Sequence, residues 1–168
     1  MQTEAKEWPP VLAQLLGEEA ATYRELRGSS LTLRKAIVAS NLAAVRTEVE
    51  AHQALLSQLR AQQQAALRVC REGGLLAPEE PYRLSRLRQA VPDRDHAPVG
   101  VALENAVAAA RDAARELAHN RQLIARLSAW ASREIRLLLE PLTNATRYGA
   151  AQDGETRSPG AALVDRRG

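Results

Sequence analysis

The feature that most constrains this chain is a 40-residue stretch, Val101–Glu140, that contains neither glycine nor proline. It consists largely of Ala, Leu, Arg and Glu, which have the highest helix propensities. Small and apolar residues recur in it at alternating spacings of four and three, so they form one stripe on a continuous helix of roughly 60 Å. A helix of this length without an internal cap needs other helices to pack against. The stripe is imperfect, because Arg121 and Ser128 fall on it, and Leu123, Leu127, Trp130 and Leu137 widen its second half. Its other members are Leu103, Val107, Ala110, Ala114, Leu117, Ile124, Ala131, Ile135 and Leu138.

The composition limits the kind of core that the chain can form. Its 168 residues suit one domain with a tail, and its 45% apolar content is mostly Ala and Leu. Phenylalanine is absent and aromatic residues make up 3% of the chain, which disfavours a thick globular core or a β-sandwich. Thin packing of helix on helix, in which alanine permits close approach, fits better.

The charge and the cysteine content limit the classes of partner that the chain can have. The net charge is +3, and the arginines are dispersed among Glu and Asp rather than gathered on one face. The short basic runs Arg83–Gln89 and Arg166–Arg167 are the only hints of a nucleic-acid binder, so we expect no nucleic acid partner. Cys70 is the single cysteine, which leaves no disulfide framework or thiolate metal cluster and favours a buried filler role.

The sequence carries no targeting or membrane signal. The segment MQTEAKEWPP lacks the basic and apolar regions of a signal peptide, and no run approaches the roughly 18 apolar residues of a membrane span. We therefore expect a soluble, cytoplasmic protein without membrane insertion.

Two further long helices precede the organising stretch, at about 10–39 and 41–72. The first keeps its three-four rhythm through Gly28, which costs about 1 kcal/mol relative to alanine, so we expect a continuous but weakened helix. Ser40–Asn41 offers N-cap chemistry, and Gly73–Gly74 suits a left-handed C-cap. The break between the helices is compatible with a hairpin or with one long rod, and the cap favours the hairpin.

A proline-rich connector, residues 75–100, follows the second helix. Its four prolines mark loop, but residues 81–90 predict a short amphipathic helix. The residues expected to face inward are Tyr82, Leu84, Leu87 and Val91. A connector of this length returns the chain, so that the last long helix packs antiparallel to the second.

These elements predict an all-α fold: an elongated antiparallel bundle or coiled coil of three long helices with a short connector helix and a flexible C-terminal tail. The last long helix should run over 99–140 and end before Pro141, which lacks a backbone donor. We expect a single bundle domain over 1–149. The remainder, 150–168, is too poor in apolar residues to offset its ordering entropy and should be disordered.

No motif for catalysis or for binding a cofactor is present. The chain has no nucleophile elbow, phosphate loop or dinucleotide fingerprint. Neither His96 nor His119 has a ligand pattern around it, and His52 falls on the stripe of the second helix as a semi-buried residue. We therefore predict that the protein is not an enzyme and has no cofactor or metal.

The segments His119–Ile124 and Thr146–Gly149 resemble motifs of the FlgN family of flagellar export chaperones. The segment His119–Ile124 matches the N-x-x-L-[IL] core that the family carries in its last long helix. Some two dozen residues later come Pro141 and Thr146–Gly149, which match its T-x-Y-G turn. Upstream, the segments that resemble the first helical pair are Tyr23–Leu26, Leu33–Ile37 and Ala39–Leu42. In the second helix Leu55–Arg60 matches, but Gln62–Gln64 replaces the charged cluster that is usual in the family.

The resemblance implies a cytoplasmic chaperone of flagellar type III export. Such proteins bind hook–filament junction (hook-associated) proteins through the C-terminal amphipathic helices of these clients, prevent premature assembly and deliver them to the export gate. By position, Asn120, Leu123, Ile124 and Leu127 would lie on or beside the client-binding helix, and Tyr148–Gly149 would belong to the segment used at the export gate. We expect a monomer or weak dimer.

Three alternatives remain open, and one of them is a helical protein that associates with nucleic acid. The width of the apolar stripe can instead serve a three-helix core. The chain can also be a structural coiled-coil scaffold whose stripes are satisfied by homo-oligomerisation. For Tyr148, local packing onto the long helix is the alternative to a role at the export gate.

Overall fold

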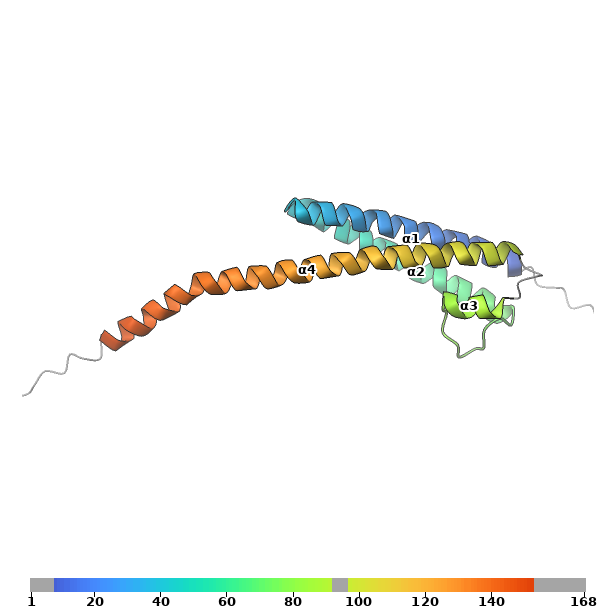
Figure 1. Ribbon diagram of the computed structural model, residues 1–168. Helices are drawn as coiled ribbons and strands as arrows, with labels where there is room; N and C mark the ends of the chain where they lie inside the picture. Colours follow the sequence, from blue (N-terminus) through green and yellow to red (C-terminus); the bar gives the residue numbers. More distant parts are fainter. Residues whose placement is uncertain (1–7, 92–96, 153–168) are drawn as a thin grey trace, which may run out of the picture. The chain divides into compact units, whose positions relative to one another are not determined.

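The computed structural model describes residues 8–91 and 97–152, with side chains described up to Glu140. Over these residues the chain forms four α-helices and no strand, which confirms the all-α prediction. The chain divides into two units, Met1–Gln122 and Leu123–Gly168, and the boundary lies within the last helix. The helices are α1 (Trp8–Val38), α2 (Leu42–Glu72), α3 (Leu84–Ala90) and α4 (Ala97–Gln152) (Figure 1).

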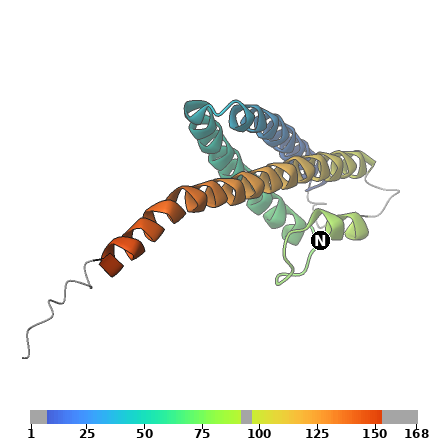
Figure 2. The same ribbon diagram turned by 60° about the vertical axis from the view of Figure 1, so that its left-hand side comes forward.

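Helices α1 and α2 form an antiparallel hairpin, so the prediction of a hairpin rather than a rod is confirmed (Figures 1 and 2). The turn is made by Ser40, whose φ of 53° lies in the left-handed region, and by Asn41. The Asn41 side chain accepts a hydrogen bond from the backbone N–H of Ala44 at 3.1 Å. This contact satisfies one of the donors that every helix start leaves unpaired.

Glycine lies within α1 at Gly28, where the helix tolerates it, and follows the end of α2 at Gly73–Gly74. Helix α1 continues through Gly28, as expected, and a Cβ atom at that position would meet nothing within 4 Å. Helix α2 ends at Glu72 and is capped by Gly73, and the left-handed residue is Gly74, with φ of 73°. The N–H of Gly74 donates to the carbonyl of Arg71 at 3.1 Å, and that of Leu75 donates to the carbonyl of Cys70 at 2.9 Å. These two bonds form a Schellman motif, which pairs carbonyls at the helix end.

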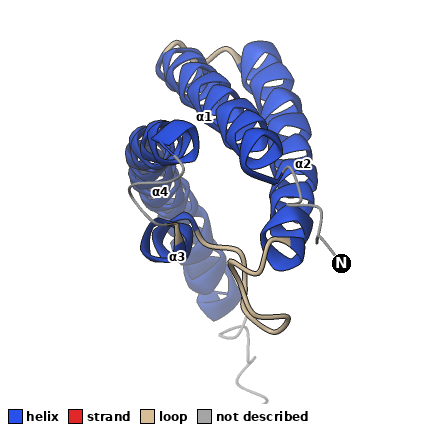
Figure 3. Cartoon of the chain, turned by 90° about the vertical axis from the view of Figure 1, so that its right-hand side faces the viewer, coloured by secondary structure: helices blue, strands red, loops and turns tan. Residues whose placement is uncertain are grey.

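The core of the first unit combines α1, α2, the connector and the beginning of α4. Figure 3 shows α1 beside α2 and α3 beside α4. Small side chains at the contacts keep the helices close together, which agrees with the thin packing that the composition predicts. The buried cluster consists of Leu12, Leu16, Ala20, Ala66, Cys70, Leu76, Leu87, Val91, Val99, Leu103, Ala106 and Ala109.

The buried line of α4 differs from the predicted stripe. Beyond Leu103, the buried residues of α4 precede the predicted ones by one position, for example Ala106 rather than Val107. Alanine occurs all around this part of the helix, so apolar character alone does not distinguish neighbouring registers. The predicted Arg121 is exposed, and Asn120 is buried in its place.

The bounds of two elements also differ from those expected. Helix α3 begins at Leu84 rather than at about 81, and α4 begins at Ala97. Helix α4 does not end before Pro141 but continues to Gln152. A proline removes one backbone donor and disfavours the helix locally, but helical turns on both sides can accommodate it. Apart from 150–152, which belong to α4, the predicted disordered tail lies outside the described residues.

One domain is expected over 1–149, whereas the chain divides into two units after Gln122.

Candidate functional site

The second unit presents large apolar side chains to solvent. Between Leu123 and Glu140, α4 carries seven such residues, each between 43% and 72% exposed, and all of them except Leu139 lie toward one side of the helix. Fully burying a side chain of this size is worth about 1.5–3 kcal/mol, so their exposure is unfavourable for an isolated helix. We call this surface the apolar face. It consists of Ile124, Leu127, Trp130, Ile135, Leu137 and Leu138.

The apolar face is wider than the contact line of a simple two-helix coiled coil. At roughly 100° per residue, its members span about 160° of the helix circumference, whereas a strict coiled-coil seam is narrower. The exposed arginines Arg126, Arg133 and Arg136 lie outside this arc, and Glu134 lies within it. The helix is therefore amphipathic, with one acidic residue inside its apolar side.

The residues predicted from the resemblance fall into three groups. Ile124 and Leu127 are exposed members of the apolar face, and Leu123 is half-buried. Asn120 is 3% exposed and belongs to the first unit. Tyr148–Gly149 lies within the helical backbone of α4, and its side chains lie outside the described residues.

Asn120 is engaged by α1 in a buried polar layer. Its side-chain Nδ2 donates to the carbonyl of Ser30 at 2.7 Å, and its Oδ1 accepts from Nε of Arg34 at 3.1 Å. The same guanidinium pairs with the carboxylate of Glu116. Within the first unit, Arg27 also pairs with Asp112 at 3.7 Å. From the pair Arg27–Asp112 to the pair Arg34–Glu116, the residue numbers increase along both helices. Helix α4 therefore runs parallel to α1 over this region and antiparallel to α2.

A histidine from α2 continues the polar layer on the other side of α1. Ser30 Oγ lies 3.0 Å from Nε2 of His52, and Ser29 Oγ lies 3.0 Å from its Nδ1. Ser29 also donates to Oε2 of Glu48 at 2.6 Å. A serine beside a histidine suggests a nucleophile, but Ser30 is fully buried and its hydroxyl donates to the carbonyl of Leu26 at 2.7 Å. This pair therefore holds α1 and α2 together.

Only part of this polar layer could be predicted from the sequence. His52 was expected as a semi-buried stripe residue, and the structure buries it, with 9% of its surface exposed. Ser30 also falls on the stripe of its helix. Two polar residues on facing stripes of a predicted hairpin are a signal for a polar contact. Arg34 and Glu116 lie beside the stripes, and 82 residues separate them, so the pattern of either helix does not reveal their contact.

A second buried polar cluster surrounds Glu19 of α1. Its carboxylate is fully buried and accepts hydrogen bonds from the hydroxyl of Tyr82 at 2.6 Å and from Gln63 at 3.1 Å. Burial, followed by the negative charge of Glu19, raises the pKa of Tyr23 to about 12 and that of Cys70 to about 11. The same two causes raise the pKa of Tyr82. The cluster connects α1, α2 and the connector through neutral hydroxyl, thiol and amide groups.

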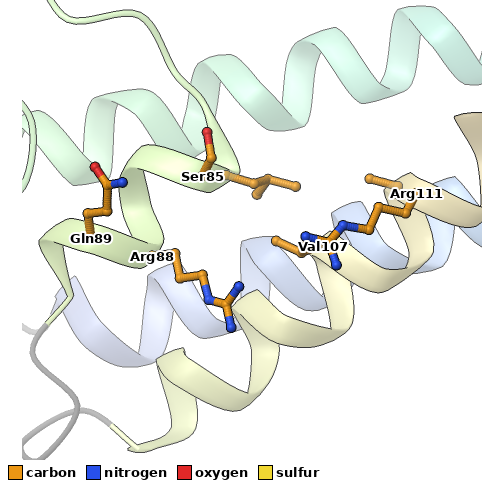
Figure 4. Close-up of a pocket in the computed structure, with 7 residues that line it drawn as sticks. Ser85, Arg88, Gln89, Val107 and Arg111 are labelled. Atoms are coloured by element: carbon orange, nitrogen blue, oxygen red, sulfur yellow. The ribbon is translucent and has the colours of Figure 1, made fainter.

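A groove lies between α3 and the first part of α4, both in the first unit (Figure 4). It has a volume of about 370 Å³. Leu84 of α3 and Val107 and Ala110 of α4 supply its apolar surface. Its polar lining comes from Ser85, Arg88, Gln89 and Arg111.

The described residues supply little that could hold a metal ion. No group of three or more His, Cys, Asp or Glu residues within 8–91 and 97–140 is arranged to bind one. Every buried side-chain nitrogen or oxygen atom in these ranges has a hydrogen-bond partner. None of the helices, over the residues searched, combines the length and apolar character needed to cross a membrane. Within the described residues, the stretch that carries the apolar face holds more exposed large apolar side chains than any other stretch of the same length.

Comparison with known proteins adds no assignment: no family model matches the chain, and neither a characterised protein nor a solved structure matches it.

Proposed function

We propose that this protein is a cytoplasmic export chaperone of the flagellar type III system. In this proposal it binds the C-terminal amphipathic helices of hook–filament junction proteins, prevents their premature assembly and delivers them to the export gate. The observation that carries the proposal is the apolar face, whose six members are large apolar side chains exposed to solvent. The resemblance of His119–Ile124 and Thr146–Gly149 to the FlgN family supplies the class of partner.

The chemistry of the apolar face suits a helical client. An amphipathic helix docks by placing apolar side chains spaced three and four residues apart against a complementary apolar surface. The spacing from Ile124 to Leu127, and from Ile135 to Leu138, follows this rule. The width of the face leaves room for more than one client helix or for a helix packed off-centre. Asn120 is engaged by α1, so we assign client contact to the exposed residues that follow it.

The test replaces one apolar residue by a charged one. Ile124→Asp places a carboxylate on the apolar face, and binding of the C-terminal helices of hook–filament junction proteins from the same genome should fall by at least about tenfold, or about 1.4 kcal/mol. The matched control is Ala129→Asp, which introduces the same charge at an exposed position on the opposite side of the same helix. Isothermal titration calorimetry would measure both, beside circular dichroism of the free proteins. Equal binding by the two variants would refute the proposal.

Light scattering distinguishes the scaffold alternative. A monomer that forms a complex with the client supports a chaperone. A stable homo-oligomer that Ile124→Asp dissociates, without any client binding by the wild-type protein, would identify the apolar face as a self-association surface instead.

A further inference from the structure

The groove between α3 and α4 has a wall that is fixed in place by the protein's own contacts. Tyr82, two residues before α3, donates to the buried Glu19 carboxylate at 2.6 Å. Leu87 of α3 is fully buried in the core. The guanidinium of Arg88 pairs with Glu104 of α4 at 2.7 Å, which joins the two sides of the groove. The groove therefore exists without a ligand and requires no ordering step to receive one.

Its lining combines two kinds of chemistry. Leu84, Val107 and Ala110 offer apolar surface, and the guanidiniums of Arg88 and Arg111 stand at its edge (Figure 4). Arg88 shares its charge with Glu104, whereas Arg111 forms no ion pair with another residue in the described ranges. An exposed guanidinium beside an apolar surface complements a ligand with an apolar group next to a carboxylate.

We propose that this groove binds a short peptide segment of a partner protein in which a large apolar side chain adjoins an acidic residue. Its volume of about 370 Å³ lies at the low end of the roughly 300–1,000 Å³ range of ligand pockets, so it suits one or two side chains rather than a whole helix. The apolar side chain occupies the surface formed by Leu84, Val107 and Ala110, and the carboxylate pairs with Arg111.

The same groove is poorly suited to nucleic acid. A phosphate backbone gains from many cations along its track, whereas this groove has two guanidiniums, one of which Glu104 already neutralises. The apolar part of the lining would gain nothing from a sugar–phosphate chain. The proposal is also independent of the proposed export function, because none of the lining residues belongs to the apolar face of the second unit.

The experiment uses the full-length protein and a pair of fluorescein-labelled peptides. Both peptides are Gly/Ser chains with a central Leu-Leu pair, followed in one by Glu-Glu and in the other by Lys-Lys. Fluorescence polarisation should show saturable binding of the Glu-Glu peptide and at least about tenfold weaker binding of the Lys-Lys peptide, which corresponds to about 1.4 kcal/mol.

Two variants separate the apolar and the charged contributions. Ala110→Leu fills the groove, and Arg111→Glu reverses the charge at its edge; each should weaken binding of the Glu-Glu peptide by about tenfold or more. The matched controls are Ala114→Leu on the same helix and Arg60→Glu on α2, both at exposed positions outside the groove, and they should bind like the wild-type protein. Because Arg111 is exposed, its variant should fold even if Ala110→Leu does not.

Three results would overturn the proposal. The first is the absence of saturable binding of the Glu-Glu peptide by the wild-type protein. The second is unchanged binding in Arg111→Glu and in a folded Ala110→Leu. The third is displacement of the peptide by a single-stranded oligonucleotide whose own affinity falls in Arg111→Glu but not in Ala110→Leu, which would identify a phosphate site instead.

Discussion

The two described parts of α4 use their apolar residues in opposite ways. From Ala97 to Gln122, the helix buries mostly alanine, for example Ala106 and Ala113, with few larger side chains. From Leu123 to Glu140 it carries larger apolar side chains, and these are exposed. Small side chains let backbones approach closely, so the first part is explained by the packing of its own unit. The second part has apolar surface beyond what its own unit buries, and this difference directs attention to a partner.

The sharpest test of this comparison substitutes the same residue type in both parts of the helix. Leu103→Ala removes a side chain that is 2% exposed and should destabilise the protein by about 2–5 kcal/mol, since it leaves a cavity in the core. Leu138→Ala removes one that is 72% exposed and should change the free energy of unfolding by no more than about 0.5 kcal/mol. Urea unfolding followed by circular dichroism measures both. Similar losses in the two variants would mean that the second part is packed in solution.

The next largest effect is expected at Asn120, close to the boundary between the two parts. Asn120→Ala leaves the Ser30 carbonyl and Nε of Arg34 without this partner, which should cost about 1–3 kcal/mol of stability. The exposed Gln122 provides the control, because Gln122→Ala should be nearly neutral. If Asn120→Ala kept full stability but lost client binding, Asn120 would belong to the client surface rather than to the bundle.

Alkaline pH should destabilise the first unit and leave residues 123–140 unaffected. The pKa of Cys70 is raised from 9.0 to about 11 and that of Tyr23 from 10.0 to about 12, so the folded state holds these protons more tightly than the unfolded state. Their contribution is fully present below pH 9 and is lost as the pH rises from 9 to 12. The urea concentration at the midpoint of unfolding should therefore fall over this range. In the Cys70→Ala variant it should fall less steeply between pH 9 and 11.

Residues 123–140 contain no tyrosine or cysteine, so their helical content should not follow this titration. A urea midpoint that stays constant from pH 9 to 12 would contradict the burial of the two groups.

The smallest effect is expected when the second unit is removed. Every member of the buried core cluster precedes Leu123, so deletion of residues 123–168 should change the free energy of unfolding of the remainder by no more than about 0.5 kcal/mol. Differential scanning calorimetry of the shortened chain would check this. Loss of a cooperative transition would show that the first unit depends on the second.

Local chemistry made much of the hairpin predictable. Asn41 caps α2 and Gly74 adopts the left-handed conformation because each residue type suits its position regardless of what packs around it. The inward-facing Leu87 was equally clear from spacing. These features depend on a few neighbouring residues, which is the range over which a single sequence is informative.

The register of α4 and its end were harder to predict. Where alanine lines several sides of a helix, as it does around Ala106, the choice of buried side depends on contacts with distant residues such as the hydrogen bonds of Asn120. Pro141 indicated an end that the helix does not have. The contact role of the exposed residues Ile124 and Leu127 was predicted from a resemblance, whereas the periodicity alone favoured a place for them in a three-helix core. Whether an apolar stripe is covered is decided by what lies opposite it.

The two tryptophans of the chain occupy different units and different surroundings. Trp8 is half-buried, and its indole ring lies so close to Gly73 that a Cβ atom there would come within 3.1 Å of it. Trp130 is 63% exposed on the apolar face. Intrinsic fluorescence therefore offers two independent optical signals. In a Trp130→Phe variant, the emission of Trp8 reports whether the ends of the hairpin are packed together. In a Trp8→Phe variant, the emission of Trp130 reports the binding of a partner to the second unit.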